Sequence, residues 1–124
     1  MTNEKNDIKP LNKRRVGKFW ERKAADYLRL NGFQILYMNY RTRYSEIDII
    51  AQDREALVFV EVKYRSSTKA GDPLEAVDAR KIQQIRRTAL KYMHFKGYNP
   101  ESTSIRFDCI GITGSGINHV ENAF

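Results

Sequence analysis

Two apolar runs joined by a short polar link constrain the fold of this chain most strongly. They are residues 45–51 (Ser-Glu-Ile-Asp-Ile-Ile-Ala) and residues 57–65 (Leu-Val-Phe-Val-Glu-Val-Lys-Tyr-Arg), with Gln-Asp-Arg-Glu-Ala between them. Short apolar runs rich in β-branched residues and bounded by a polar turn are typical of strands. We therefore predict an antiparallel hairpin centred on Arg54-Glu55, in a register that places Asp48 directly opposite Glu61.

Three charged side chains interrupt these apolar runs. Glu61 and Lys63 are two residues apart, so they project from the same face of a strand, and Asp48 is expected opposite Glu61. A buried charge is costly unless it is paired or bound to a metal, and two facing carboxylates repel each other across a sheet. A divalent cation between the two acids would remove that repulsion.

Mg²⁺ is the cation that suits such a site, with Mn²⁺ as its substitute, because it takes oxygen ligands from one or two carboxylates together with water and phosphate. A bound ion can polarise a phosphate and lower the pKa of an attacking water. Lys63 would orient that water or offset charge in the transition state. The alternative is an ordinary sheet on which Glu61 and Lys63 form a minor surface pair.

A third acid is predicted on the first helix, over residues 16–31. Trp20, Ala24, Tyr27 and Leu28 recur at helical spacing, and Glu21 falls inside the arc that they cover. We expect this carboxylate to face the core or the rim of a site, as a further catalytic or metal-binding group. The alternative is a boundary glutamate paired with a nearby arginine.

The remaining pattern predicts an α/β fold with a mixed sheet flanked by helices. A strand is expected over residues 33–40, a loop over 66–72, a second helix from Asp72 or Asp78, a strand over 104–113 and a short edge strand over 117–121. The second helix crosses the sheet, so the strand that follows it should run parallel to an earlier one. Asp108, inside the fourth strand, is expected to fix a helix end or a basic side chain.

Composition favours a polyanionic partner. The 124 residues hold 22 Lys and Arg against 15 Asp and Glu, a net charge of +7, and such a surplus suits nucleic acid. Residues 1–14 are predicted as a flexible basic arm, and residues 15–124 as one domain. The basic residues expected to contact nucleic acid, or else to form a solvated surface, are Arg43, Arg65, Lys69, Lys81, Arg86 and Arg87.

The cellular setting can be predicted from what the sequence lacks. One cysteine cannot form a disulfide within the chain, which fits a reducing compartment. No apolar stretch approaches the length of a membrane span, and the first residues are polar, unlike a signal peptide. We therefore expect a cytoplasmic protein with no membrane partner.

Several segments together resemble the bacterial YraN family. They are Gly17-x3-Glu21-x2-Ala24-x2-Tyr27-Leu28-x3-Gly32, Glu-Ile-Asp-Ile-Ile-Ala at 46–51, Phe-Val-Glu-Val-Lys-x-Arg at 59–65, Ala76-Val77-x3-Lys81 and Arg-Phe-Asp-Cys-Ile-Gly at 106–111. That family is related to the restriction-endonuclease-like superfamily and to archaeal Holliday junction resolvases. The resemblance implies a restriction-endonuclease-like three-layer core.

The resemblance also implies roles for single residues. The superfamily's acid–acid–x–lysine core falls on Asp48, Glu61 and Lys63, and Glu21 matches the helix acid of the resolvase-like branch. A metal-dependent endodeoxyribonuclease acting on branched or recombining DNA is therefore expected, and its alternative is a non-catalytic nucleic-acid-binding protein of the same fold. An enzyme that cuts two symmetric strands would be a homodimer. One departure is Ser45, where the family has Gly, which tolerates more backbone conformations.

Overall fold

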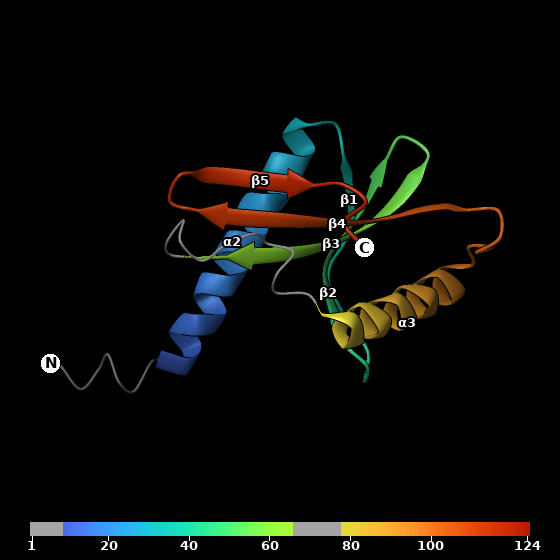
Figure 1. Ribbon diagram of the computed structural model, residues 1–124, viewed down its shortest axis with the longest axis horizontal. Coiled ribbons are helices and arrows are strands. Elements are labelled where there is room, and N and C mark those ends of the chain that lie inside the picture. The colour runs from blue at the N-terminus through green and yellow to red at the C-terminus, as the bar shows by residue number, and fades with distance from the viewer. Residues whose placement is uncertain (1–8, 66–77) are drawn as a thin grey trace, which may run out of the picture.

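The computed structural model describes residues 9–65 and 78–124, with side chains from residue 15 onward within those ranges. Their elements follow in the order α2 (Lys9–Leu30), β1 (Gln34–Arg41), β2 (Glu46–Asp53), β3 (Ala56–Tyr64), α3 (Ala79–Lys96), β4 (Ser104–Thr113) and β5 (Gly116–Val120) (Figure 1). The strands form one sheet in sequence order. β3 and β4 are parallel and the other neighbours antiparallel, so the predicted mixed sheet and parallel crossover are confirmed.

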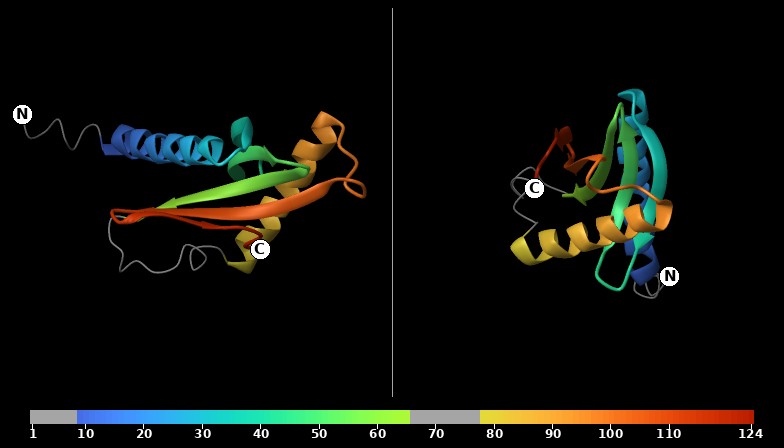
Figure 2. Two further views of the ribbon diagram at one scale, coloured as in Figure 1. Left: turned by 90° about the horizontal axis from the view of Figure 1, so that it is seen from above. Right: turned by 90° about the vertical axis from the view of Figure 1, so that its right-hand side faces the viewer.

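The two helices cover opposite faces of the sheet, which gives three layers (Figure 2). On one face, Leu28 of α2 packs in a buried cluster with Val60 of β3. On the other face, Tyr92 of α3 packs in a second cluster with Phe59 of the same strand. Successive residues of β3 therefore enter different cores, as strand alternation requires. This α/β arrangement is consistent with a restriction-endonuclease-like core.

The hairpin between β2 and β3 has the predicted register over its paired length. Asp53 pairs with Ala56 across the turn, and the ladder continues to Ile49 opposite Val60. Arg54 adopts a positive φ of 57° in the turn. The ladder ends one step before Asp48 and Glu61. Instead, the carboxylate of Asp48 accepts a hydrogen bond of 2.8 Å from the backbone N–H of Val62.

Side-chain alternation is broken in β2 at Asp48. Ile49 packs in the cluster beneath α2, whereas Ile47 and Ile50 both pack in the cluster beneath α3. On the neighbouring strand, Asn39 has a positive φ of 56°. The pairs on either side of Asn39 and Asp48 are intact, so both strands bend at the same level. This bend explains why Asp48 points toward the end of β3 rather than into a core.

The helix ends follow recognisable capping chemistry. α3 begins after Asp78, whose side chain accepts a 2.8 Å hydrogen bond from the backbone N–H of Lys81, and ends at Gly97 with a φ of 83°. Of the two predicted starts, Asp78 is correct, and Asp72 lies outside the described residues. α2 begins at Lys9 rather than at residue 16, while residues 1–8 of the predicted arm lie outside the description. Neither of these helices has the length and apolar character needed to cross a membrane.

Candidate active site

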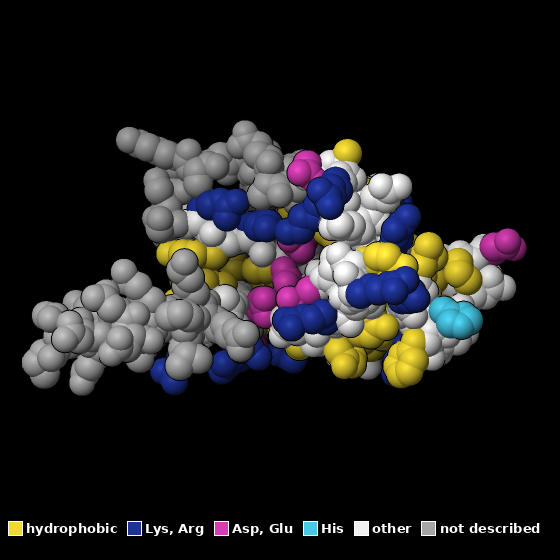
Figure 3. All heavy atoms as spheres, turned by 90° about the horizontal axis from the view of Figure 1, so that it is seen from below, with side chains coloured by type: hydrophobic (Ala, Val, Ile, Leu, Met, Phe, Trp, Pro, Cys, Tyr) yellow, Lys and Arg dark blue, Asp and Glu magenta, His cyan; other side chains and the backbone are white. Residues whose placement is uncertain are grey.

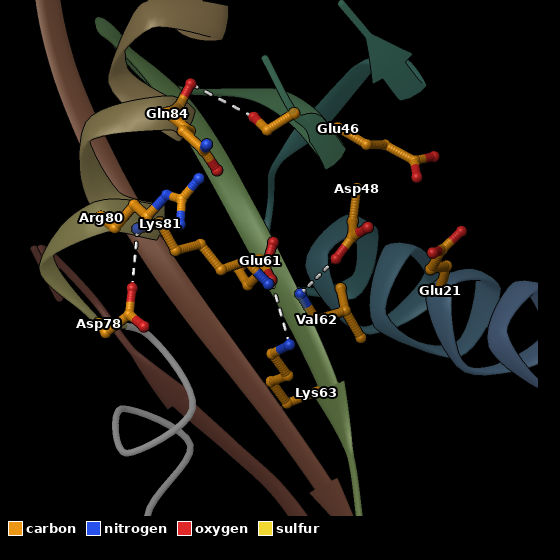
Figure 4. Close-up of a pocket in the computed structure, with 11 residues that line it drawn as sticks. Glu21, Glu46, Asp48, Glu61, Val62, Lys63, Asp78, Arg80, Lys81 and Gln84 are labelled. Carbon is orange, nitrogen blue, oxygen red and sulfur yellow. Dashed lines mark hydrogen bonds and ion pairs between the residues drawn. The ribbon is translucent and has the colours of Figure 1, made fainter. Parts of the chain in front are cut away.

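A polar hollow opens where α2, the start of β2, the end of β3 and the first turns of α3 meet (Figure 4). Its volume is about 580 Å³. The four residues predicted as catalytic all line it. The complete lining is Glu21, Ser45, Glu46, Asp48, Glu61, Val62, Lys63, Asp78, Arg80, Lys81 and Gln84. Segments far apart in the sequence thus bring the predicted acids and the predicted lysine to one place.

Glu61 is the most buried charged group of the hollow, at 5% exposure. One of its carboxylate oxygens lies 3.4 Å from the amine of Lys63 and also forms an ion pair with Lys81. These two lysines offset the cost of burying the carboxylate. The alternative of a solvent-face surface pair for Glu61 and Lys63 is therefore wrong, because the carboxylate lies inside the protein.

Asp48 is in a different electrostatic situation. Burial raises the pKa of its carboxyl well above the ordinary value, and the nearby charge of Glu61 raises it further. The hydrogen bond from Val62 opposes this shift, while the charges of Glu21 and Glu46 add to it. The lysines thus neutralise Glu61, but Asp48 remains short of positive charge.

Glu21 reaches the hollow from α2, as its position within the apolar arc predicted. Its carboxylate accepts a 2.7 Å hydrogen bond from the side-chain amide of Asn39. The alternative partner, an arginine, is wrong for the contacts that the structure describes. Asn39 is the residue at which β1 bends, so the bend also fixes the orientation of this acid.

The two lysines beside Glu61 differ in how strongly they hold their protons. Burial lowers the pKa of Lys63, and the neighbouring amine of Lys81 lowers it further, against the charge of Glu61. Burial also lowers the pKa of Lys81, but the hydrogen bond to Glu61 and that carboxylate's charge outweigh it, so the net shift is upward. Lys81 is therefore the firm counterion, and Lys63 gives up its proton more readily.

The donor chemistry of the hollow fits a hard divalent cation. Asp48, Glu61 and Glu21 offer carboxylate oxygens, which Mg²⁺ and Mn²⁺ prefer. Burial and then the charge of Glu61 raise the pKa of Asp48, and a bound cation would oppose both effects. Within residues 15–65 and 78–124, however, no three acidic, His or Cys side chains already form a metal-ligand group. Both lysines contact the same oxygen of Glu61, Oε2.

The residues predicted to bind nucleic acid lie in several places. Lys81 is in the hollow itself. Arg43 and Arg87 lie against the ring of Tyr44, each 5.2 Å from its centroid, and Arg86 lies 5.0 Å from the ring of Phe107. Arg65 follows β3, with its guanidinium donating to the carbonyl of Tyr64. Lys69 lies outside the described residues.

Sequence reasoning missed two contributions to the hollow. Lys81 was predicted as a phosphate contact but not as the partner of Glu61, although it lies in one of the segments that resemble the YraN family. Asn39 was not singled out, yet an asparagine within a strand pattern is a signal, because Asn tolerates positive φ better than most residues.

Serine fits its place at position 45. The Ser45 hydroxyl bonds to that of Thr88 at 2.9 Å and donates to the carbonyl of Gln84 at 3.3 Å. Asn39, Arg54 and Asn122 are the non-glycine residues with positive φ in the described chain, so Ser45 does not occupy a backbone conformation that favours glycine.

Comparison with known proteins identifies relatives along nearly the whole chain. The family model described as "Uncharacterised protein family UPF0102", which is the YraN family, matches residues 20–112. A UPF0102 protein of Sulfurihydrogenibium sp. is 41% identical over 114 residues, covering 92% of this chain and 97% of the relative. Those of Persephonella marina and Lachnoclostridium phytofermentans are 43% and 45% identical, covering 87% and 92% of this chain and 91% and 96% of the relatives.

Proposed function

We propose that this chain, which belongs to the uncharacterised protein family UPF0102, is a nucleic-acid-binding protein with a metal-dependent endonuclease centre. The observation that carries this proposal is the meeting of Glu21, Asp48 and Glu61 with two lysines in one hollow beside the bend in the sheet. Acids crowded against a buried, lysine-paired carboxylate make a site in which charge is concentrated for a purpose other than stability.

The roles follow from the contacts. Asp48 and Glu61 would hold Mg²⁺ or Mn²⁺, with Glu21 completing or supporting the set, and the ion would supply a polarised phosphate and an activated water. The Val62 N–H fixes one oxygen of Asp48, and Asn39 fixes one of Glu21. Lys63, with its lowered pKa, is suited to orient the water and exchange a proton with it. Lys81 would contact the substrate phosphate once its amine leaves Glu61.

Surface charge supports nucleic acid as the substrate. The chain has a net charge of +7, and Figure 3 shows acidic side chains as a small patch between groups of Lys and Arg. Such a layout attracts a phosphate backbone to the flanks while reserving the acids for a cation. The substrate in this proposal is branched or recombining DNA, cut by a homodimer in the cytoplasm.

A cleavage assay tests the enzyme directly. Labelled branched, duplex and single-stranded DNA would be incubated with Mg²⁺, Mn²⁺ or EDTA and wild-type protein, Asp48→Asn or Lys63→Ala. We expect metal-dependent cuts that fall by at least about 100-fold in both variants, the scale of losing one catalytic group. The matched control is Asp26→Asn, which removes an exposed carboxylate of α2 paired with Arg29 and should cut normally. Equal cutting by Asp48→Asn would refute the proposed centre.

The second candidate is a nucleic-acid-binding protein without catalysis. The pairing of Glu61 with both Lys63 and Lys81 favours it, because those ion pairs satisfy the buried acid without a metal. This protein would bind DNA tightly in EDTA and in Mg²⁺ alike, and no cut would appear in either. Tight binding without cuts at any metal concentration would establish the binder.

A further inference from the structure

A second hollow lies along α3 beside the candidate active site. Its volume is about 380 Å³, and it is lined by Tyr44, Arg87, Leu90, Lys91 and His94. Cations gather at the Tyr44 ring: the guanidinium carbons of Arg43 and Arg87 are each 5.2 Å from its centroid, and the amine of Lys91 is 5.8 Å away. Arg43 also donates a 3.3 Å hydrogen bond to the Tyr44 hydroxyl.

The three cations have unbalanced charge. Among the residues that the structure describes, none of Arg43, Arg87 and Lys91 forms an ion pair with a carboxylate. Like charges held this close repel one another, and an anion between them would relieve that repulsion. We call Arg43, Tyr44, Arg87 and Lys91 the Tyr44 cluster.

Hydrogen bonds hold the loop that carries Tyr44 firmly on α3. Thr88 is fully buried, and its hydroxyl bonds to those of Thr42 and Ser45, both at 2.9 Å. The Thr42 N–H also donates to the carbonyl of Ser45 at 2.9 Å. Because both ends of the short loop are fixed to one buried residue, Tyr44 has a set position over the next turn of the helix. The cluster is therefore organised before any ligand arrives.

Neighbouring residues of the same segments line the two hollows. Ser45 lines the first and Tyr44 the second, and on α3 Lys81 lines the first while Arg87 and Lys91 line the second. At a rise of about 1.5 Å per residue, Arg87 and Lys91 lie about 9 Å and 15 Å beyond Lys81 along the helix axis. With about 3.4 Å per nucleotide in a stacked strand, this span matches roughly three to four nucleotides.

We propose that the Tyr44 cluster is a phosphate-binding subsite for the strand whose scissile phosphate lies at the candidate active site. It would hold a phosphodiester three or four nucleotides away from that phosphate. The Tyr44 ring keeps the cations together through cation–π contacts, and the cations bind the phosphate oxygens. The subsite rests on the proposed function for its substrate, but it needs no metal and no catalysis.

Binding measured against strand length tests the subsite. Fluorescence anisotropy in EDTA would follow labelled single strands of about two to ten nucleotides. For the wild type, we expect affinity to rise by several-fold once a strand exceeds about four nucleotides. Arg87→Gln and Lys91→Gln should remove that rise and lower the slope of log K against log salt by about 0.7 each, the value for one phosphate contact. Both side chains are exposed, so the variants should fold.

Lys96→Gln is the matched control. Lys96 is exposed in the last turn of the same helix and does not line either hollow, so its variant should keep the length dependence. A rise that persists in both Arg87→Gln and Lys91→Gln overturns the proposal. So does an equal loss in Lys96→Gln, which would indicate only the general charge of the helix.

Competition distinguishes a strand from a free anion. Inorganic phosphate or a nucleoside monophosphate should compete weakly, since each fills one subsite only. Displacement of the longest strand by phosphate as efficiently as by a short oligonucleotide overturns the proposal in favour of a free-phosphate site. Cleavage is scored separately: an absence of cuts with the length dependence intact refutes the nuclease but leaves the subsite in place.

Discussion

At the scale of single residues, the two lysines of the candidate site balance the charge of one acid but not of the other. Glu61 is buried and paired with Lys63 and Lys81. Among the described residues, Asp48 accepts a hydrogen bond from the Val62 N–H alone and lies near the charges of Glu61, Glu21 and Glu46. An arrangement of charges that favours cation binding can lower the stability of the metal-free protein. We therefore expect the ionised Asp48 carboxylate to lower the stability of the metal-free protein.

The pH dependence of stability should expose that cost. A carboxyl whose folded pKa is raised holds its proton longer in the folded state, so stability falls as pH rises from about 4 through the folded pKa. For metal-free protein above that window, Asp48→Asn should leave the free energy of unfolding unchanged or raise it by about 1 kcal/mol. Urea unfolding between about pH 4 and pH 9 measures this. A loss of several kcal/mol in the variant would instead assign Asp48 a structural role.

At the scale of elements, a second charged group holds β4, β5 and α2 together. Asp108 is fully buried and accepts two 2.9 Å hydrogen bonds from Arg106 and one of 2.8 Å from His119, whose other ring nitrogen lies 3.2 Å from the hydroxyl of Tyr27. The N–H of Asn122 adds a bond of 3.0 Å. The prediction that Asp108 fixes a basic side chain is confirmed, and its role lies in joining elements.

Removing Asp108 should therefore lower the free energy of unfolding strongly. Asp108→Ala removes the buried partner that Arg106 and His119 share, although Arg106 keeps Asp53 at 3.0 Å. The change should lower the free energy of unfolding by about 3 kcal/mol. Burial alone would raise the pKa of this carboxyl, but the bonds from His119 and Arg106 lower it overall. The stabilisation is thus present above about pH 4 and is lost as pH falls through the lowered folded pKa.

Chemical unfolding of Asp108→Ala beside Asp26→Ala checks this prediction. Asp26 is exposed and pairs only with Arg29 in the described contacts, so its removal should cost about 0.5 kcal/mol or less. Similar losses in the two variants would contradict the joining role of Asp108.

Much of the element level followed from local pattern. The fourth strand lies at residues 104–113 as predicted, and the hairpin register followed from where the turn residues stand. The bend at Asn39 and Asp48 did not follow, because it depends on how both strands pack against two helices. The pairing of Lys81 with Glu61 was also out of reach, since it depends on where the crossover returns α3 to the sheet. Local sequence specifies strand faces, whereas partners across layers are set by packing.

At the scale of the whole molecule, acidic and basic side chains gather in different places on the surface (Figure 3). On the face drawn in Figure 3, groups of Lys and Arg flank a small acidic patch, and the chain as a whole has a net charge of +7. A polyanion is therefore drawn to the surface, but its phosphates meet acids at the hollow unless a cation is present. Each of the two ligands, substrate and metal, should accordingly raise the affinity of the protein for the other.

Metal addition should stabilise the folded chain as a whole. A cation that binds only the folded state raises its stability by about 2.7 kcal/mol at a concentration of 100 times its Kd, so the Tm should climb with Mg²⁺ or Mn²⁺. Asp48→Asn should abolish that climb and Asp26→Asn should retain it, both followed by thermal unfolding. If neither metal changes the Tm of the wild-type protein, the binding protein without catalysis is favoured.

The start of α3 links the helix cap to the charge balance of the site. The backbone N–H of Lys81 closes the first turn on Asp78, and the side chain of the same residue neutralises Glu61. One residue thus contributes both to the cap of α3 and to the charge balance of the buried acid. If fraying of the first turn moved Lys81 away, Lys63 at 3.4 Å would be the remaining counterion of Glu61 among the described contacts.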